Sequence, residues 1–181
     1  MRARPRGHLA RHAWTAALLA VALCLTACGS AASATQRESS PSPAPAATAL
    51  NRALGQLDRL VVLRKDAFPQ NHIRFSFPAK VTVNDPAKVR AVAQALLALP
   101  TMPSGTFGVP IDLGITYRLI FATADEQLPA ISIDATGAQT VRGLGSVRWL
   151  ARSPGFWTTL GEAMGLAHPG YDAFRGHMPN A

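Results

Sequence analysis

Residues 29–47 cannot bury a hydrophobic core, and they separate a short N-terminal part of the chain from one longer folded part. Their sequence, GSAASATQRESSPSPAPAA, is small and polar, with alternating Ser-Pro and Ala-Pro pairs and no apolar periodicity. Such a segment has too little apolar surface to offset the entropy lost on folding. We therefore expect residues 28–48 to form a disordered tether and residues 49–181 to form a single globular domain.

The segment before the tether has the layout of a secretory signal peptide. Arginines stand at positions 2, 4, 6 and 11, and an apolar run follows over residues 13–28. The run contains Thr15 and Thr26, and it is shorter than the roughly 20 residues that a membrane-spanning helix needs. The pattern favours a cleaved export signal over a permanent transmembrane anchor.

The apolar run ends in the residues LTAC (25–28), which resemble the lipobox of bacterial lipoproteins. In that family the cysteine thiol receives a diacylglycerol and the signal peptidase cuts just before it. The resemblance implies a signal peptide of residues 1–27 and lipid on Cys28. Several acyl chains on one cysteine give the multiple signals that stable anchoring needs. The mature protein would be lipid-anchored to the cell membrane, facing the extracytoplasmic side.

A second cleavage site remains open. Residues 32–34, Ala-Ser-Ala, also suit the general signal peptidase, which would cut after Ala34. Cys28 would then be incidental, and the protein would be secreted without an anchor.

Removal of the signal changes the charge balance. The whole chain has 18 basic and 10 acidic residues, a net charge of +8. Four of the basic residues belong to the signal, so 14 remain against 10 acidic ones and the mature charge is +4. A mildly basic exported domain favours anionic lipid or wall polymer, whereas the absence of a basic run excludes nucleic acid as a partner.

Neither cysteine is available for a disulfide bond. Cys24 lies in the signal and Cys28 is the expected lipid site. The domain must therefore be stabilised by its hydrophobic core alone.

The first half of the domain predicts a hairpin followed by a helix. Residues 57–63 read as a strand, and residues 72–83 read as one bent strand or two short strands broken near Pro78. Asp85 and Pro86 are a helix cap and a first-turn proline, and apolar residues at helical spacing extend the helix over 86–98. Proline and glycine make residues 101–110 an irregular loop.

The second half predicts a three-stranded meander and a second helix. Strands are expected over 115–122, 130–134 and 139–142. Ser153 and Pro154 repeat the cap-and-proline start, and Gly165 closes the helix. Its buried stripe would consist of Phe156, Trp157, Leu160 and Met164. Residues 167–181 are expected to be a loosely packed tail.

The predicted order is β-β-α-β-β-β-α. This gives an α+β domain in which an antiparallel sheet of about five short strands carries two packed helices. The order lacks the regular alternation of a parallel doubly wound fold.

Several segments of the domain are similar to uncharacterised lipoproteins of actinobacteria and related soil bacteria. They are FSFPAKVTVNDPAKVRAVAQALLALPTMP, DLGITYRLIF, DATGAQTVRGLG and RSPGFW. The resemblance covers most of residues 49–181. It implies a shared fold and carries no activity, substrate or cofactor.

The residue patterns disfavour an enzyme. Ser146 in GLGSVRW lacks the GxSxG arrangement of a catalytic serine, and Arg148 stands where a phosphate-binding GxGxxG loop needs its third glycine. The histidines at 72, 168 and 177 lack metal-ligand spacing, and the carboxylates at 112, 134 and 162 are scattered. We expect no catalytic residues, no metal and no cofactor.

A cluster of arginines and aromatic residues is the candidate binding surface. It consists of Arg142, Arg148, Trp149 and Arg152, and it continues into Phe156 and Trp157. Guanidinium groups beside aromatic rings are common where proteins bind anions or other proteins. The alternative is that the tryptophans anchor the core and the arginines form a solvated rim.

These observations favour a membrane-tethered, non-catalytic binding or structural module of the cell envelope. Its partner would be an envelope protein or an anionic wall polymer. One alternative is an envelope hydrolase, which needs two carboxylates in a cleft or Ser146 beside a histidine. Another is a secreted enzyme inhibitor, which needs a rigid protruding loop, with residues 101–110 as the candidate.

Overall fold

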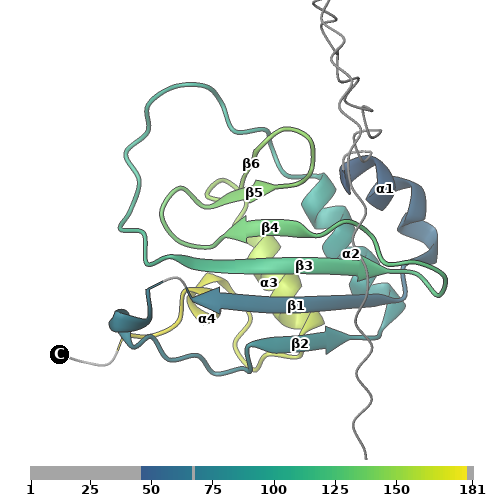
Figure 1. The fold of residues 1–181 in the computed structure, drawn as a ribbon, viewed down its shortest axis with the longest axis horizontal. Helices are drawn as coiled ribbons and strands as arrows, with labels where there is room; N and C mark the ends of the chain where they lie inside the picture. The colour runs from purple at the N-terminus through teal and green to yellow at the C-terminus, as the bar shows by residue number, and fades with distance from the viewer. Residues whose placement is uncertain (1–45, 67, 179–181) are drawn as a thin grey trace, which may run out of the picture. The chain divides into compact units, whose positions relative to one another are not determined.

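The computed structural model describes residues 46–66 and 68–178 of the 181-residue chain. The expected signal peptide, Cys28 and most of the expected tether lie outside these residues. The described part is an α+β fold with a six-stranded sheet, which confirms the predicted class (Figure 1). The strands are β1 Arg59–Asp66, β2 Lys80–Val83, β3 Ile115–Ala122, β4 Ile131–Asp134, β5 Thr140–Arg142 and β6 Arg148–Trp149. The helices are α1 Ala46–Ala53, α2 Pro86–Leu97, α3 Gly155–Ala163 and α4 Tyr171–Arg175, with short 3-10 turns at Leu54–Gln56 and Pro69–Asn71.

The strand order is β2-β1-β3-β4-β5-β6, and every neighbouring pair is antiparallel. The expected hairpin corresponds to β1 and β2, but β2 covers only the last four residues of the range 72–83 that was expected to be extended. The expected meander corresponds to β3, β4 and β5. The two units join because β1 also pairs with β3 along its whole length. Helix α2 carries the chain from β2 past β1 to β3.

The helices cover one face of the sheet. Along β3 the side chains of Ile115, Tyr117, Leu119 and Phe121 are buried, and the alternate residues are half-buried or exposed. This is the period-2 pattern of a strand with one covered face. Helices α2, α3 and α4 lie behind the sheet in the view of Figure 1, and α1 packs beside α2. Within the described residues no helix lies over the opposite face, which we call the open face.

Helix α2 begins as predicted. The Asp85 carboxylate accepts hydrogen bonds from the backbone N–H groups of Ala87 at 2.9 Å and Lys88 at 3.3 Å. Pro86 occupies the first turn, where a missing N–H costs nothing. The buried residues of the helix recur at helical spacing and are Val89, Val92, Ala93 and Leu96.

The start of α3 differs from the prediction. Pro154 occupies the cap position, and no side chain caps the helix. Ser153 contributes only its backbone carbonyl, which accepts from the Phe156 N–H at 3.0 Å. Three residues of the predicted stripe, Phe156, Trp157 and Leu160, are buried. The fourth, Met164, is half-buried and follows the last residue of α3.

The C-terminal segment is not a loose tail. Residues 171–175 form α4, and Phe174 is fully buried. The Phe174 ring lies 4.9 Å from the Trp157 ring and 5.5 Å from the Tyr117 ring, measured between centroids. His177 then pairs with Arg74 through two backbone hydrogen bonds of 2.9 Å. The prediction was wrong because one buried aromatic residue in a short segment gives no periodicity.

The N-terminal boundary of the domain also needs correction. Helix α1 begins at Ala46, inside the range that we expected to be tether. Ala46, Leu50 and Ala53 are buried at helical spacing, and the Ala46 N–H donates to the Gly143 carbonyl at 3.0 Å. The helix is short, and two of its buried residues are alanines, so its apolar face was not evident in the sequence.

Candidate functional site

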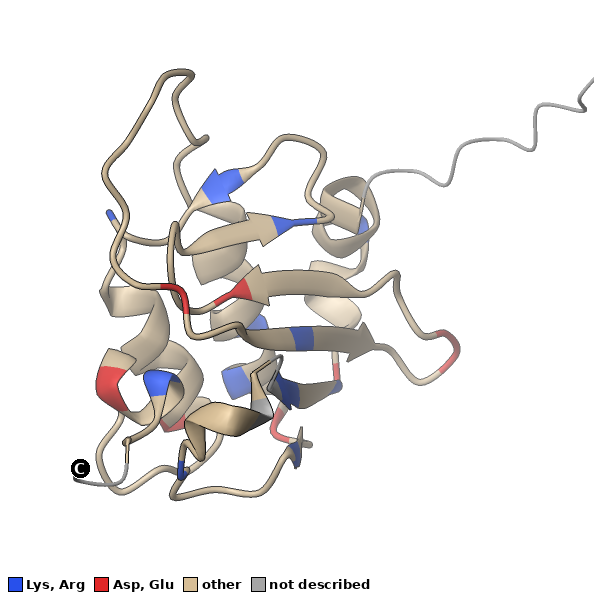
Figure 2. Cartoon of the chain, turned by 60° about the vertical axis from the view of Figure 1, so that its left-hand side comes forward, with Lys and Arg blue, Asp and Glu red and all other residues tan. Residues whose placement is uncertain are grey.

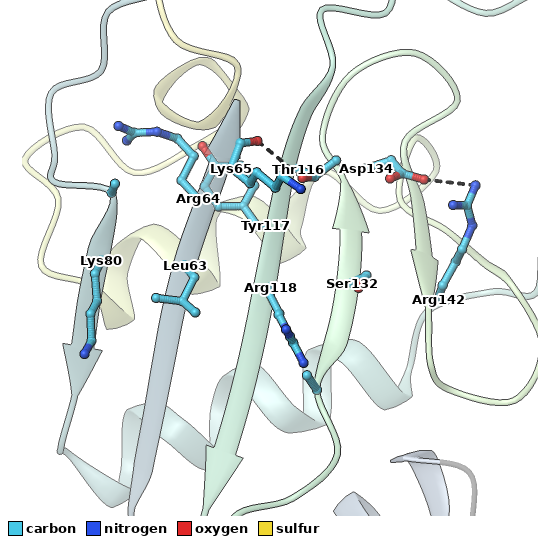
Figure 3. A pocket seen from close by; sticks show the side chains of 12 residues that line it. Leu63, Arg64, Lys65, Lys80, Thr116, Tyr117, Arg118, Ser132, Asp134 and Arg142 are labelled. Atoms are coloured by element: carbon cyan, nitrogen blue, oxygen red, sulfur yellow. Dashed lines mark hydrogen bonds and ion pairs between the residues drawn. The ribbon is translucent and has the colours of Figure 1, made fainter. Parts of the chain in front are cut away.

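The open face of the sheet contains a shallow hollow of about 760 Å³, which we call the basin (Figure 3). Strands β1 to β5 supply most of its lining. Its lining residues are Leu63, Arg64, Lys65, Ala79, Lys80, Thr116, Tyr117, Arg118, Ala130, Ser132, Asp134 and Arg142. Five of these residues are basic and one is acidic.

The strand register places three of the cations in one line across the sheet. Leu63 on β1 lies opposite Lys80 on β2 and opposite Arg118 on β3. Ser132 on β4 lies opposite Arg118 and opposite Arg142 on β5. We call these five residues, Lys80, Leu63, Arg118, Ser132 and Arg142, the cationic row. Because neighbouring strands lie about 4.8 Å apart, the backbones of successive cations in the row are about 10 Å apart.

Most of the positive charge in the basin is not neutralised by the protein. Within residues 46–66 and 68–178, Lys65, Lys80 and Arg118 make no ion pair. In Figure 2 the strands carry more basic than acidic segments. The basin is therefore a cationic surface on a sheet face that lacks a helical cover.

Asp134 is the acidic residue of the basin, and two neighbours occupy one of its oxygens. Arg142 Nη2 lies 3.2 Å from Asp134 Oδ2, and the Thr140 hydroxyl donates to the same oxygen at 2.7 Å. The Arg142 side chain nevertheless remains 66% exposed. A guanidinium group has five N–H donors, so Arg142 can still donate to a ligand.

Arg64 lines one end of the basin but has a structural role. Its guanidinium lies 3.6 Å from the centre of the Phe75 ring, and Nη1 donates to the Phe77 carbonyl at 3.0 Å. The register pairs Arg64 with buried Tyr117, so Arg64 belongs to the helix-covered face. This arginine holds the segment before β2 and is not among the free cations.

The four residues of the predicted binding surface lie in different environments. Arg142 belongs to the basin. Trp149 is half-buried, with the Phe107 ring 5.4 Å away and the Arg152 guanidinium 5.2 Å from its ring centre. Arg148 Nη1 donates to the Leu99 carbonyl at 3.0 Å, which fixes the end of α2 to β6.

The aromatic continuation of that surface belongs to the core. Phe156 and Trp157 are 3% and 1% exposed, so they cannot contact a partner. Tyr117 and Phe174 surround Trp157, as the core-anchor alternative expects.

The loop over residues 101–110 is irregular, as predicted, and it is attached at its start. Met102 N–H donates to the Val147 carbonyl and Trp149 N–H donates to the Pro100 carbonyl, both at 2.9 Å. Beyond Phe107 the chain is exposed, with Val109 at 52% and Ile111 at 82%.

The described residues offer no assembled catalytic or metal site. Ser146 is exposed and makes no hydrogen bond to a described histidine. A second hollow of about 390 Å³ contains Ser76, His168, Asp172 and His177 in its lining, but within the described chain none of these side chains bonds to another. Asp172 instead pairs with Arg175 at 2.9 Å. No group of three metal-ligating side chains occurs in this part of the chain.

The three basin cations without an ion pair were not singled out from the sequence, and neither was Arg64. Lys65, Lys80 and Arg118 stand among apolar residues in or beside the predicted strands, at outward positions of a period-2 pattern. That alternation was the available signal for Arg118. The order of the strands was not evident in the sequence, so the alignment of Lys80 with Arg118 could not be predicted.

Comparison with known proteins does not assign a function to the basin. The chain matches no family model, no curated protein and no solved structure. Among the described residues, no helix combines the length and the apolar composition that a membrane span requires.

Proposed function

We propose that this protein is a lipid-anchored module of the bacterial cell envelope that binds an anionic envelope component in the basin. The proposal assigns it no catalysis. It joins the expected lipid on Cys28 and the expected mature charge of +4 to the cationic open face of the sheet.

The observation that carries the proposal is the set of three cations without an ion pair, Lys65, Lys80 and Arg118, on a sheet face that no described helix covers. Arg64 and Arg148 donate to backbone carbonyls and so have structural roles. Among the described residues, exposed cations without an ion pair also occur outside the basin, as Lys88 and Arg52 do. The three basin cations differ because they line one hollow that has a single acidic residue, and such a concentration of charge attracts an anion over distance.

The rest of the basin suits an anionic ligand with a neutral backbone. Leu63 and Ala79 give an apolar floor, and the Ser132 hydroxyl can donate to a ligand oxygen. The Thr116 hydroxyl instead donates to the Lys65 carbonyl at 3.3 Å, so it can only accept from a ligand. The guanidinium of Arg118 can bind a carboxylate or phosphate through two parallel hydrogen bonds. Recognition of this kind needs no conformational change in the sheet.

Anchoring by Cys28 would place the basin close to the envelope surface. If the expected tether is a flexible coil, its mean reach is roughly 25 Å. The domain would therefore stay within a thin layer above the membrane. An anionic component of that layer would be present there at a high effective concentration.

The test is the affinity of the full chain, purified from bacterial membranes in detergent, for dextran sulfate, with uncharged dextran as reference. The variant Lys80→Ala/Arg118→Ala should bind dextran sulfate about tenfold more weakly, because each exposed contact contributes up to about 1 kcal/mol. The control variant Lys88→Ala/Arg52→Ala removes the same charges from exposed sites on α2 and α1. It should bind like the wild type. Equal losses in both variants, or no binding by the wild type, would contradict the proposal.

A further inference from the structure

We infer that the ligand is a linear polyanion that lies across the strands, with charges spaced to contact Lys80, Arg118 and Arg142 in turn. This inference rests on the proposed function and specifies the shape and charge spacing of the ligand. The cationic row is the feature that carries it.

The cations repeat across the sheet and not along any one strand at short spacing. Along β3 the open-face neighbours of Arg118 are Thr116 and Ile120, which are uncharged. Across the sheet, a cation recurs on every second strand, from Lys80 on β2 to Arg118 on β3 to Arg142 on β5. A polyanion that follows the row meets three cations over about 20 Å.

The row of residues next to the cationic row, on the side of Thr116, would not bind the same polyanion. It runs from Lys65 on β1 through Thr116 on β3 to Asp134 on β4. One end is basic and the other acidic, so this row has no net charge. A polyanion that shifts by two residues along the strands exchanges a cation for the Asp134 carboxylate, and Figure 3 shows Asp134 beside Arg142 at that end.

The spacing of the row determines which anions gain from it. The backbones of successive cations are about 10 Å apart, which is one Debye length in 0.1 M salt, so the charges of the row influence one another only weakly. A small anion such as inorganic phosphate contacts one of them and binds weakly. When several negative charges belong to one ligand molecule, the second and third contacts form within a complex that already exists. Each of these additional contacts therefore increases the affinity of the whole ligand.

Peptides in the polyproline II conformation are suitable probes, because they can carry negative charges at a known spacing close to that of the row. That helix has three residues per turn and rises about 3.1 Å per residue, so a glutamate in every Glu-Pro-Pro repeat falls on one side at about 9.3 Å intervals. The probes are acetylated, amidated peptides with one, two, three and five repeats. A fifth probe has the composition of the three-repeat peptide with its three glutamates consecutive.

The affinity of the full chain in detergent should increase about threefold to fivefold with each repeat up to three, because each exposed ion pair contributes up to about 1 kcal/mol. The five-repeat probe should add less than twofold. The peptide with consecutive glutamates should bind several-fold more weakly than the evenly spaced one.

Variants of the protein test whether the peptides bind along the cationic row. Lys80→Ala should remove the gain from the third repeat and leave the gain from the second, since Arg118 and Arg142 remain. Lys88→Ala removes a lysine from α2, outside the basin, and should leave the whole series unchanged. Unchanged thermal unfolding of both variants controls for folding.

The outcomes separate the inference from the proposed function. Binding of dextran sulfate that requires Lys80 and Arg118, with no dependence on peptide length or glutamate spacing, overturns the linear polyanion and leaves the proposed function standing. If the wild-type protein binds neither dextran sulfate nor the peptides, both the inference and the proposed function are overturned. Tight binding to phosphatidylglycerol vesicles together with a flat peptide series also overturns the inference, because the basin would then recognise a lipid surface.

Discussion

The hydroxyl of Tyr117 on β3 donates a 2.7 Å hydrogen bond to the backbone carbonyl of Phe174 in α4. The two residues are 57 positions apart, and both are buried. The bond attaches the C-terminal helix to the centre of the sheet, so the last described segment is part of the core.

Tyr117→Phe should lower the free energy of unfolding by about 1–3 kcal/mol, because the substitution leaves a buried carbonyl without this donor. The ring and its aromatic contacts are retained. Urea unfolding of the purified protein measures the effect. A loss below a few tenths of a kcal/mol would show that the bond does not hold α4.

Gly176 should be one of the least replaceable residues outside the sheet. Its φ of 67° and ψ of −177° define a conformation that is essentially restricted to glycine. An added Cβ would lie 2.9 Å from a Phe75 ring carbon and 3.0 Å from the Arg74 carbonyl oxygen. Gly176→Ala should therefore cost more than about 2 kcal/mol, from strain together with overpacking.

Gly165→Ala is the matched control for that substitution. Gly165 also has a positive φ, 73°, but an added Cβ would meet open space. It should cost only about 1 kcal/mol, from the backbone conformation alone. Similar midpoints of thermal unfolding for the two variants would show that the contacts around Gly176 do not matter.

Asp85→Ala should destabilise the protein by about 1 kcal/mol, because two N–H groups at the start of α2 lose their acceptor. Asp85→Ser keeps an acceptor at the same position and should recover most of the loss. Equal urea midpoints for the alanine variant and the wild type would contradict the cap.

The sequence predicted those elements whose own residues carry a complete pattern. Strand β3 alternates over eight residues, and α2 combines a cap, a first-turn proline and a regular apolar stripe. Helices α1 and α4 were missed because each is short and its stability comes from tertiary contacts, as with Phe174 against Trp157. Strand β6 has only two residues, which is too short for a pattern to emerge.

The candidate site was predictable only in part. Arg142 was recognised as a surface cation, but the other two cations of its row come from β2 and β3, far away in the sequence. The cationic row depends on the pairing of β1 with β3, and sequence-local periodicity carries no information about that pairing. A shift of one residue would move Arg118 to the covered face.

Asp134→Asn should strengthen binding of the three-repeat peptide by about twofold to fivefold, because it removes the one negative charge of the basin. The asparagine side-chain oxygen can still accept from the Thr140 hydroxyl, which limits structural change. The same peptide titration measures the effect. Weaker binding by this variant would indicate that Asp134 serves the ligand by orienting Arg142.

The most direct test of a lipid-anchored envelope module is the intact mass and detergent-phase partition of the protein from a bacterial host, with Cys28→Ala for comparison. We predict a wild-type chain that begins at Cys28, carries the mass of its acyl chains and enters the detergent phase. The variant should lack the acyl mass. A wild-type chain that begins after Ala34 and stays in the aqueous phase, as the variant does, would contradict the anchor and identify a freely secreted protein.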